Sequence, residues 1–104
     1  MSKSICCIIS IKAKPSWLKI KRGDREQYWK KVAAIVRDFA EQVSFQYYDA
    51  DAFHADHSDL VICETPDLIA YHHMWDRIKD TEIFTEGFYE ITDVRLGIKG
   101  VSHG

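Results

Sequence analysis

The chain has 104 residues, of which 46% are hydrophobic and 29% are charged. This composition is typical of one small globular domain, here spanning residues 1–104, and excludes a fibrous or disordered chain. The net charge of −2, and the lack of a basic stripe interleaved with stacking aromatic residues, argue against nucleic acid as a partner. The apolar run at residues 5–9 is too short for a membrane span or a secretion signal, so we expect a cytoplasmic protein that does not bind membranes.

The first predicted element is a strand over residues 4–13. Its early part is rich in isoleucine and apolar on both alternating faces, which is typical of a strand covered on both sides. Pro15 ends it, because proline cannot donate to a sheet. Asp24 followed by Gln27 three residues later resembles a capping box, and apolar residues at helical spacing then predict a helix over residues 24–41.

The second half repeats this order with two strands before the helix. Alternation predicts a strand over residues 43–49, and the apolar run at residues 59–64 predicts another. Thr65 is expected to cap a second helix, with Pro66 at its first position and Asp67 in its first turn. A last strand is predicted over residues 88–96, with residues 97–104 loose or forming an edge. The predicted helix places these residues on the face that we expect to meet the sheet: Leu68, Tyr71, His72, Trp75 and Ile78.

The resulting order is βαββαβ, which predicts an α+β domain of the ferredoxin-like fold. In this fold an antiparallel sheet carries both helices on one face. The other face would be left uncovered, although Cys6 and Ile8 and one of the two alternating sets within residues 60–63 make it apolar. We therefore predict a homodimer that packs sheet against sheet and forms a dimeric α/β barrel.

Several segments resemble a known family. They are residues 14–18 (KPSWL), 48–53 (YDADAF), 58–60 (SDL), 64–68 (ETPDL), 70–71 (AY), 80–81 (DT) and 88–91 (FYEI). Over nearly its whole length the chain resembles the darcynin family of small bacterial proteins, which has no assigned general activity. It is also similar to the darcynin-like protein of prodigiosin pigment clusters, and this implies a role in making the methoxy-bipyrrole half of that pigment. More widely it resembles dimeric α/β-barrel proteins, whose ligands lie between the sheet and the helices of one subunit.

The candidate site residues come mainly from residues 47–75, which hold four of the five histidines. His72, among aromatic residues, is the candidate acid, base or hydrogen-bond partner, and Glu64 or Asp49 would orient it. The alternatives are a core histidine bonded to a backbone carbonyl or to Glu64, or a haem ligand, which would give a coloured protein. The candidate walls of a site for a flat ligand are Trp17, Tyr47, Tyr71, Trp75 and Phe88, unless they serve only as core.

We expect neither a metal nor a cofactor. His54 and His57, with the aspartates at positions 51, 56 and 59, could bind a divalent cation, but their spacing defines no known cage. Cys6, Cys7 and Cys63 form no CxxC pair and are expected to be reduced core residues. The sequence carries no dinucleotide fingerprint or phosphate loop, so any oxygen chemistry would proceed without a cofactor.

Two functions are consistent with this sequence. The first is a homodimer that binds an aromatic or pyrrolic metabolite in secondary-metabolite biosynthesis, with or without processing it. The second is a dimeric interaction module without catalysis that assists a larger pathway enzyme. Its support is the charge asymmetry of the sequence. Residues 1–40 contain ten basic and three acidic residues, whereas residues 41–104 contain four basic and thirteen acidic residues. Whether the protein is an enzyme stays open.

Overall fold

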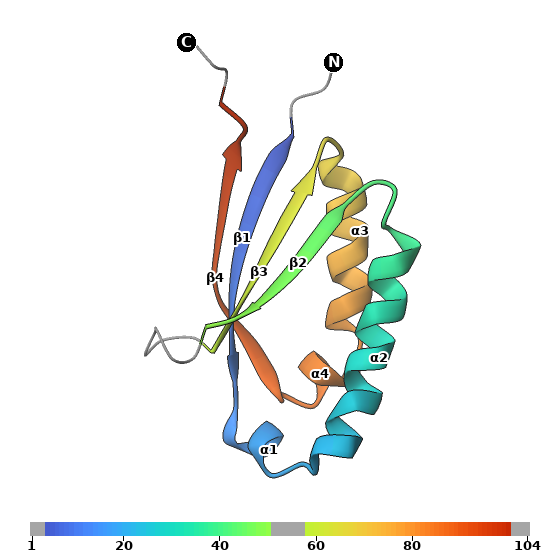
Figure 1. Ribbon diagram of the computed structural model, residues 1–104, viewed down its shortest axis with the longest axis vertical. Coiled ribbons are helices and arrows are strands. Elements are labelled where there is room, and N and C mark those ends of the chain that lie inside the picture. Colours follow the sequence, from blue (N-terminus) through green and yellow to red (C-terminus); the bar gives the residue numbers. More distant parts are fainter. Residues whose placement is uncertain (1–3, 51–57, 101–104) are drawn as a thin grey trace.

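The computed structural model describes residues 4–50 and 58–100. Four strands, β1 (Ile5–Ala13), β2 (Ser44–Asp49), β3 (Asp59–Thr65) and β4 (Tyr89–Ile98), form one antiparallel sheet in the order β2-β3-β1-β4. The helices α2 (Arg22–Asp38) and α3 (Leu68–Lys79) lie on one face of it (Figure 1). The predicted α+β ferredoxin-like fold is confirmed. The histidines at 54 and 57 and the aspartates at 51 and 56, considered as metal ligands, lie outside the described residues.

Two short helices were not predicted. The one-turn helices α1 (Pro15–Leu18) and α4 (Glu82–Thr85) both lie in the lower part of the molecule as drawn in Figure 1. Pro15 lies just after the end of β1, as expected, and it is also the first residue of α1, because its fixed φ angle suits the first turn of a helix. Among the described helices, none is long and apolar enough to cross a membrane.

The starts of both long helices differ from the prediction. Helix α2 begins at Arg22, so the expected capping box at Asp24 is wrong, and Asp24 lies in the first turn, where a carboxylate favours the helix dipole. Helix α3 is capped by Asp67, because its carboxylate accepts hydrogen bonds from the amides of Ile69 and Ala70, both at 3.1 Å. Thr65, the expected cap, instead ends β3.

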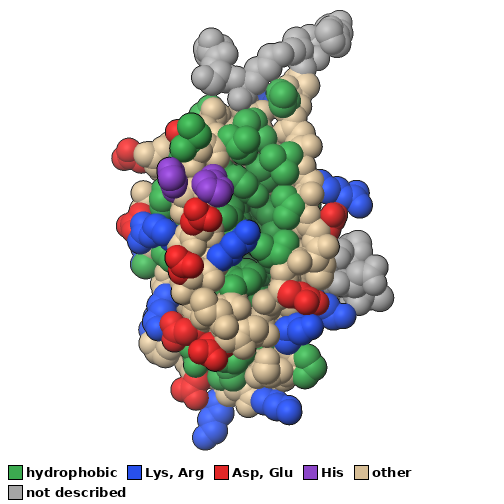
Figure 2. Space-filling view, turned by 180° about the vertical axis from the view of Figure 1, so that it is seen from behind, with side chains coloured by type: hydrophobic (Ala, Val, Ile, Leu, Met, Phe, Trp, Pro, Cys, Tyr) green, Lys and Arg blue, Asp and Glu red, His purple; other side chains and the backbone are tan. Residues whose placement is uncertain are grey.

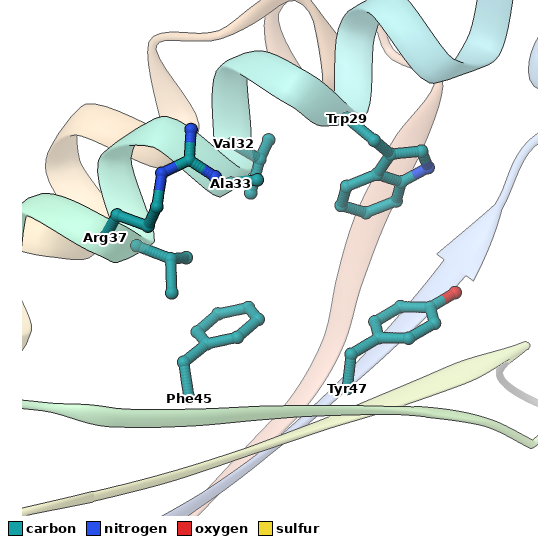
Figure 3. Close-up of a pocket in the computed structure, with 7 residues that line it drawn as sticks. Trp29, Val32, Ala33, Arg37, Phe45 and Tyr47 are labelled. Carbon is teal, nitrogen blue, oxygen red and sulfur yellow. The ribbon is translucent and has the colours of Figure 1, made fainter. Parts of the chain in front are cut away.

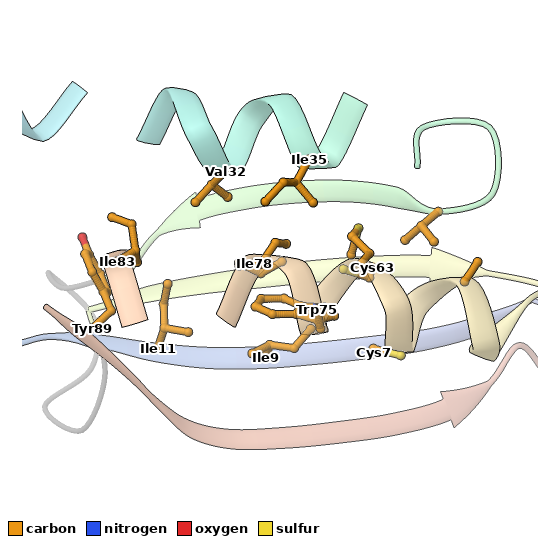
Figure 4. Close-up of a cluster of buried hydrophobic side chains, with 14 of the residues drawn as sticks. Cys7, Ile9, Ile11, Val32, Ile35, Cys63, Trp75, Ile78, Ile83 and Tyr89 are labelled. Carbon is orange, nitrogen blue, oxygen red and sulfur yellow. The ribbon is translucent and has the colours of Figure 1, made fainter. Parts of the chain in front are cut away.

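The core lies between the sheet and the two long helices (Figure 4). Alternate residues of β1 and β3 point toward the helices, and because the strand period is two, the intervening residues point away from them. Each buried aliphatic side chain stabilises the fold by roughly 2 kcal/mol. The residues that fill this layer include Cys7, Ile9, Ile11, Val32, Ile35, Val61, Cys63, Met74, Trp75 and Ile78.

Helix α3 turns much of the expected face to the sheet, because Trp75 and Ile78 are buried, but His72 is not part of that face. Met74 is fully buried, whereas the side chain of His72 is 70% exposed. The expectation that His72 faces the sheet is therefore wrong. The physical reason is that burying an imidazole without a partner is costly, while the flexible apolar side chain of Met74 fills the same layer at no such cost.

The sheet face opposite the helices has an apolar centre. Ile8 of β1 is paired with Ile62 of β3, and Leu60 projects to the same side. The sequence left open which alternating set of β3 lies on the uncovered face. Residues 60 and 62 lie on that face, and residues 61 and 63 face the helices. In the single chain Ile8 is exposed.

Candidate functional site

A groove between α3 and β4 arises because α3 does not cover this edge strand. The β1–β4 register pairs Ile9 with Val94 and Cys7 with Leu96, so these β4 side chains project toward the helix face. Yet Val94 and Leu96 are 44% and 53% exposed. Figure 2 shows the resulting hydrophobic surface beside the two histidines of α3. The groove has a volume of about 230 Å³ and is lined by Ile9, Tyr71, His72, Trp75, Asp76, Lys79, Ile91 and Val94.

The α3 rim of this groove is polar. His72 Nε2 lies 3.2 Å from Asp76 Oδ2, one helical turn away, and both side chains are exposed. Lys79, one turn further, also borders the groove. The rim therefore offers an imidazole, a carboxylate and an ammonium group to the polar atoms of a ligand.

The aromatic wall of this groove rests on two buried thiols. The hydroxyl of Tyr71 interacts with the Cys7 thiol, and burial raises the pKa of both groups. The indole of Trp75 lies against Cys63, whose pKa burial raises to about 12. The indole N–H of Trp75 has no hydrogen-bond partner of ordinary geometry within the described residues. Both thiols are thus protonated near neutral pH, as expected for core cysteines.

A second groove, of about 430 Å³, lies between α2 and the opposite edge strand, β2 (Figure 3). Its α2 wall is a stripe at positions 29, 32, 33 and 36, a spacing that brings side chains to one helix face. Its β2 wall is Phe45 and Tyr47, which project to the same side because they are two residues apart. Arg37 lies on the α2 rim. The lining residues are Trp29, Val32, Ala33, Val36, Arg37, Phe45 and Tyr47.

The aromatic wall of the α2–β2 groove rests on a buried carboxylate. Asp59 is 4% exposed and accepts a hydrogen bond of 2.9 Å from the Ser58 hydroxyl. The hydroxyls of Tyr47 and Tyr89 also hydrogen-bond to it, and burial together with the Asp59 charge raises the pKa of both tyrosines. Both hydroxyls therefore stay protonated and act as donors, which fixes the position of the Tyr47 ring.

Trp29 is fixed by aromatic contacts. Its ring meets those of Tyr47 and Tyr89 edge to face, with centroids 5.7 and 5.3 Å away. Trp17 is buried and packs against Trp29 and Phe88. Of the predicted wall residues, Trp17 and Phe88 thus line neither groove and instead support one of them, whereas Tyr47 lines the α2–β2 groove and Tyr71 and Trp75 line the other.

The structure does not bring the three predicted catalytic residues together. Glu64 is paired with Cys6 and projects from the face opposite the helices, so it cannot orient His72. Asp49 is paired with Asp59 on edge strand β2, whereas His72 borders the groove beside the other edge strand. Within residues 4–50 and 58–100, no three side chains of the metal-ligating types gather as a metal site.

Sequence reasoning missed Trp29, Phe45, Arg37 and Asp76. The apolar stripe at positions 29, 32, 33 and 36 was a signal for the first of these. The i, i+4 spacing of His72 and Asp76 was a signal for their pair.

Known proteins resemble this chain in sequence. A family model described as "Darcynin, domain of unknown function" matches residues 1–102. A protein named Darcynin from Chromobacterium violaceum is 32% identical over 53 residues, which cover 51% of this chain and 67% of that protein. Darcynin 1 from Acinetobacter baumannii is 33% identical over 52 residues, covering 50% of this chain and 58% of that protein.

Solved structures share the fold at low sequence identity. A chlorite dismutase from Candidatus Nitrospira defluvii, in complex with imidazole, superposes with a TM-score of 0.85 at 8% identity, covering 95% of this chain and 41% of the other. A heme-binding protein from Thermus thermophilus gives 0.73 at 14% identity, covering 94% and 40%. The chain spans about two fifths of the length of each, and at these identities the likeness concerns the fold alone.

Proposed function

The chain belongs to the darcynin family, and from this premise and the shape of the α3–β4 groove we propose that it binds a flat aromatic or pyrrolic small molecule there. The observation that carries the proposal is the groove itself: an apolar floor on β1 and β4, two aromatic side chains from α3, and a polar rim. Sites for small organic molecules combine mostly apolar walls with a few placed polar groups in this way.

The polar rim suits a pyrrole or a related heterocycle. A pyrrole N–H is a hydrogen-bond donor, and the Asp76 carboxylate is an acceptor at the groove edge. A carbonyl group of the ligand can accept a hydrogen bond from His72 or Lys79. The proposal assigns His72 a binding role, because Glu64 and Asp49 are not placed to support it as a catalytic base.

For the pathway, we propose secondary-metabolite biosynthesis, on the branch that makes the methoxy-bipyrrole half of prodigiosin. Its support is the resemblance of residues 14–18, 64–68 and 88–91 to the darcynin-like protein of those pigment clusters. A ligand of two linked pyrrole rings is flat and mostly apolar, which agrees with the lining of the groove.

Haem, the ligand of the heme-binding protein from Thermus thermophilus, does not fit these residues. Tyr71 and Trp75 fill the layer between α3 and the sheet, which leaves no space there for a macrocycle. The imidazoles of His72 and His73 are on the exposed side of α3, and His72 is paired with Asp76. Haem is therefore not the proposed ligand.

The proposed assembly is a homodimer through the open face of the sheet. Ile8, Leu60 and Ile62 form the apolar centre of that face, and a second copy would cover it. Sedimentation equilibrium is expected to give a dimer at micromolar concentration. An Ile8→Glu variant is expected to sediment as a folded monomer, and a monomeric wild-type protein would overturn the assembly.

The binding proposal is tested with 2,2′-bipyrrole as the probe, by fluorescence titration and by amide chemical shifts. Val94→Glu puts a charge on the groove floor and is expected to weaken binding about tenfold or more, equivalent to ~1.4 kcal/mol. Leu18→Glu is the matched control, because Leu18 is also an exposed aliphatic residue but lines neither groove. Equal affinity of the wild type and both variants, or no binding at all, would refute the proposed site.

The alternative function, an interaction module that assists a larger pathway enzyme, has one observation in its favour. Leu96 and Ile98 are exposed on an edge strand of the sheet, and such a strand can pair with another chain. A Leu96→Lys variant that binds bipyrrole normally, yet fails to support pigment formation in the producing strain, would favour this function. If Val94→Glu loses both bipyrrole binding and pigment formation, and Leu96→Lys loses neither, ligand binding would be favoured.

A further inference from the structure

The α2–β2 groove is a site of its own, since it borders edge strand β2 while the α3–β4 groove borders the other edge. We propose that it is a second small-molecule site and that it takes a flat aromatic carboxylate. The proposal is independent of the ligand of the α3–β4 groove. It depends on three properties of the second groove: walls that are already in place, a cation at the rim, and a suitable size.

The walls are held in place before any ligand arrives. Tyr47 is fixed by its hydrogen bond to buried Asp59, and Trp29 by edge-to-face contacts with Tyr47 and Tyr89. Figure 3 shows the rings of Trp29, Phe45 and Tyr47 turned toward the space between α2 and β2. A ligand that enters between such rings does not have to order them, so less of its binding energy is lost to entropy.

The charge of the groove comes from Arg37. Its side chain runs along the α2 rim toward Ala33 (Figure 3), and within the described residues it makes no ion pair. The neighbouring acid, Asp38, is already paired with Arg77 of α3 at 3.0 Å. The lining contains no carboxylate. A guanidinium group beside an apolar surface favours a planar anion, because it can donate two parallel hydrogen bonds to a carboxylate.

The size sets the number of rings. Along α2, the eight residue steps from Trp29 to Arg37 correspond to a rise of about 12 Å. The Arg37 side chain runs back toward Ala33 (Figure 3), so the space between its guanidinium group and Trp29 is shorter than this rise and suits a ligand of one or two fused rings. The volume of about 430 Å³ exceeds that of the α3–β4 groove, which agrees with a larger ring system.

The test compares 2-naphthoate with 2-naphthamide, a neutral probe of almost the same shape, by titration followed through amide chemical shifts. We expect 2-naphthoate to shift the signals of Ala33, Phe45 and Tyr47 and to leave those of Tyr71 and Ile91 unchanged. Arg37→Gln is expected to weaken 2-naphthoate about tenfold, the size of a lost charge-assisted hydrogen bond, and to leave 2-naphthamide unchanged.

Two further variants serve as controls. Arg22→Gln removes the same charge near the other end of α2, outside the groove, and is expected to leave 2-naphthoate affinity within about twofold. Ala33→Phe fills the groove from the exposed side of α2 and is expected to abolish binding of both probes while preserving the amide spectrum of the fold. The proposal is overturned if 2-naphthoate does not bind, if Arg22→Gln weakens it as much as Arg37→Gln, or if Arg37→Gln weakens both probes equally. Shifts confined to Tyr71 and Ile91 would also overturn it and would leave the α3–β4 site standing.

Discussion

The two grooves flank the same pair of helices but are built differently. The α2–β2 groove has aromatic walls supported by the buried Asp59 carboxylate, with a cation at its rim. The α3–β4 groove has a floor of exposed edge-strand residues, and its aromatic wall rests on thiols. Both exist because the sheet twists while the helices stay nearly straight, so the edge strands diverge from the helices (Figure 1). One fold thus carries two grooves whose chemistry depends on which side chains occupy the two edges of the sheet.

The largest expected effect is on the support of the α2–β2 groove. Asp59→Ala removes the acceptor of three hydroxyl groups, those of Ser58, Tyr47 and Tyr89. Because buried donors are left without a partner, we expect the free energy of unfolding to fall by about 3 kcal/mol. Urea denaturation followed by tryptophan fluorescence measures it.

The matched control is Asp93→Ala. Asp93 is an acid of β4 whose pair with Arg95 lies at the surface, and we expect its loss to cost less than about 0.5 kcal/mol. If Asp59→Ala costs no more than Asp93→Ala, the carboxylate does not support the groove, and the contrast between the two sites is lost.

A smaller effect on stability is expected beneath the α3–β4 groove, where the supporting thiols titrate at high pH. The pKa of Cys63 is raised by burial from 9.0 to about 12, and that of Cys7 is also raised. The folded protein therefore retains the proton that the unfolded chain loses above pH 9, so stability falls as the pH rises through this range. For Cys63 alone, the free energy of unfolding is expected to be about 1 kcal/mol lower at pH 10 than at pH 8.

Cys63→Ala isolates this contribution. The variant is less stable at pH 8 because it leaves a cavity, but its stability is expected to fall less than that of the wild type between pH 8 and pH 10. Parallel pH profiles would mean that the thiol is not protected from solvent and that this groove lacks a closed support.

How far the sequence predicts these features differs between fold and site. The period of two in residues 5–11 and the order of elements were enough for the sheet and its helices, because the burial of apolar side chains decides the structure at those positions. The choice between Met74 and His72 as the buried residue of α3 was not predictable from spacing alone. The two positions flank the stripe of Tyr71, Trp75 and Ile78 on opposite sides, so a small rotation of the helix exchanges them. The outcome depends on the cost of desolvating the imidazole and on the shape of the surrounding layer.

The grooves were harder to predict because they depend on what is left uncovered. Trp29 and Phe45 are far apart in the sequence, and they meet only because α2 runs along β2. Glu64 and Asp49 were expected near His72 because they end strands, but strand ends do not reveal the face or the edge to which a side chain belongs. The register, which pairs Glu64 with Cys6, decides that.

The smallest expected effect on stability concerns the rim of the α3–β4 groove. His72 and Asp76 form an exposed pair one turn apart, and such pairs contribute little because water screens them, so His72→Ala is expected to change the free energy of unfolding by less than about 0.5 kcal/mol. The same variant is expected to weaken 2,2′-bipyrrole binding, because the lost imidazole is a groove lining group. A large loss of stability would assign the pair a structural role, as for Asp59, and would remove the difference between the two grooves. A change in binding without a change in stability means that the rim is free to exchange its internal pair for a ligand.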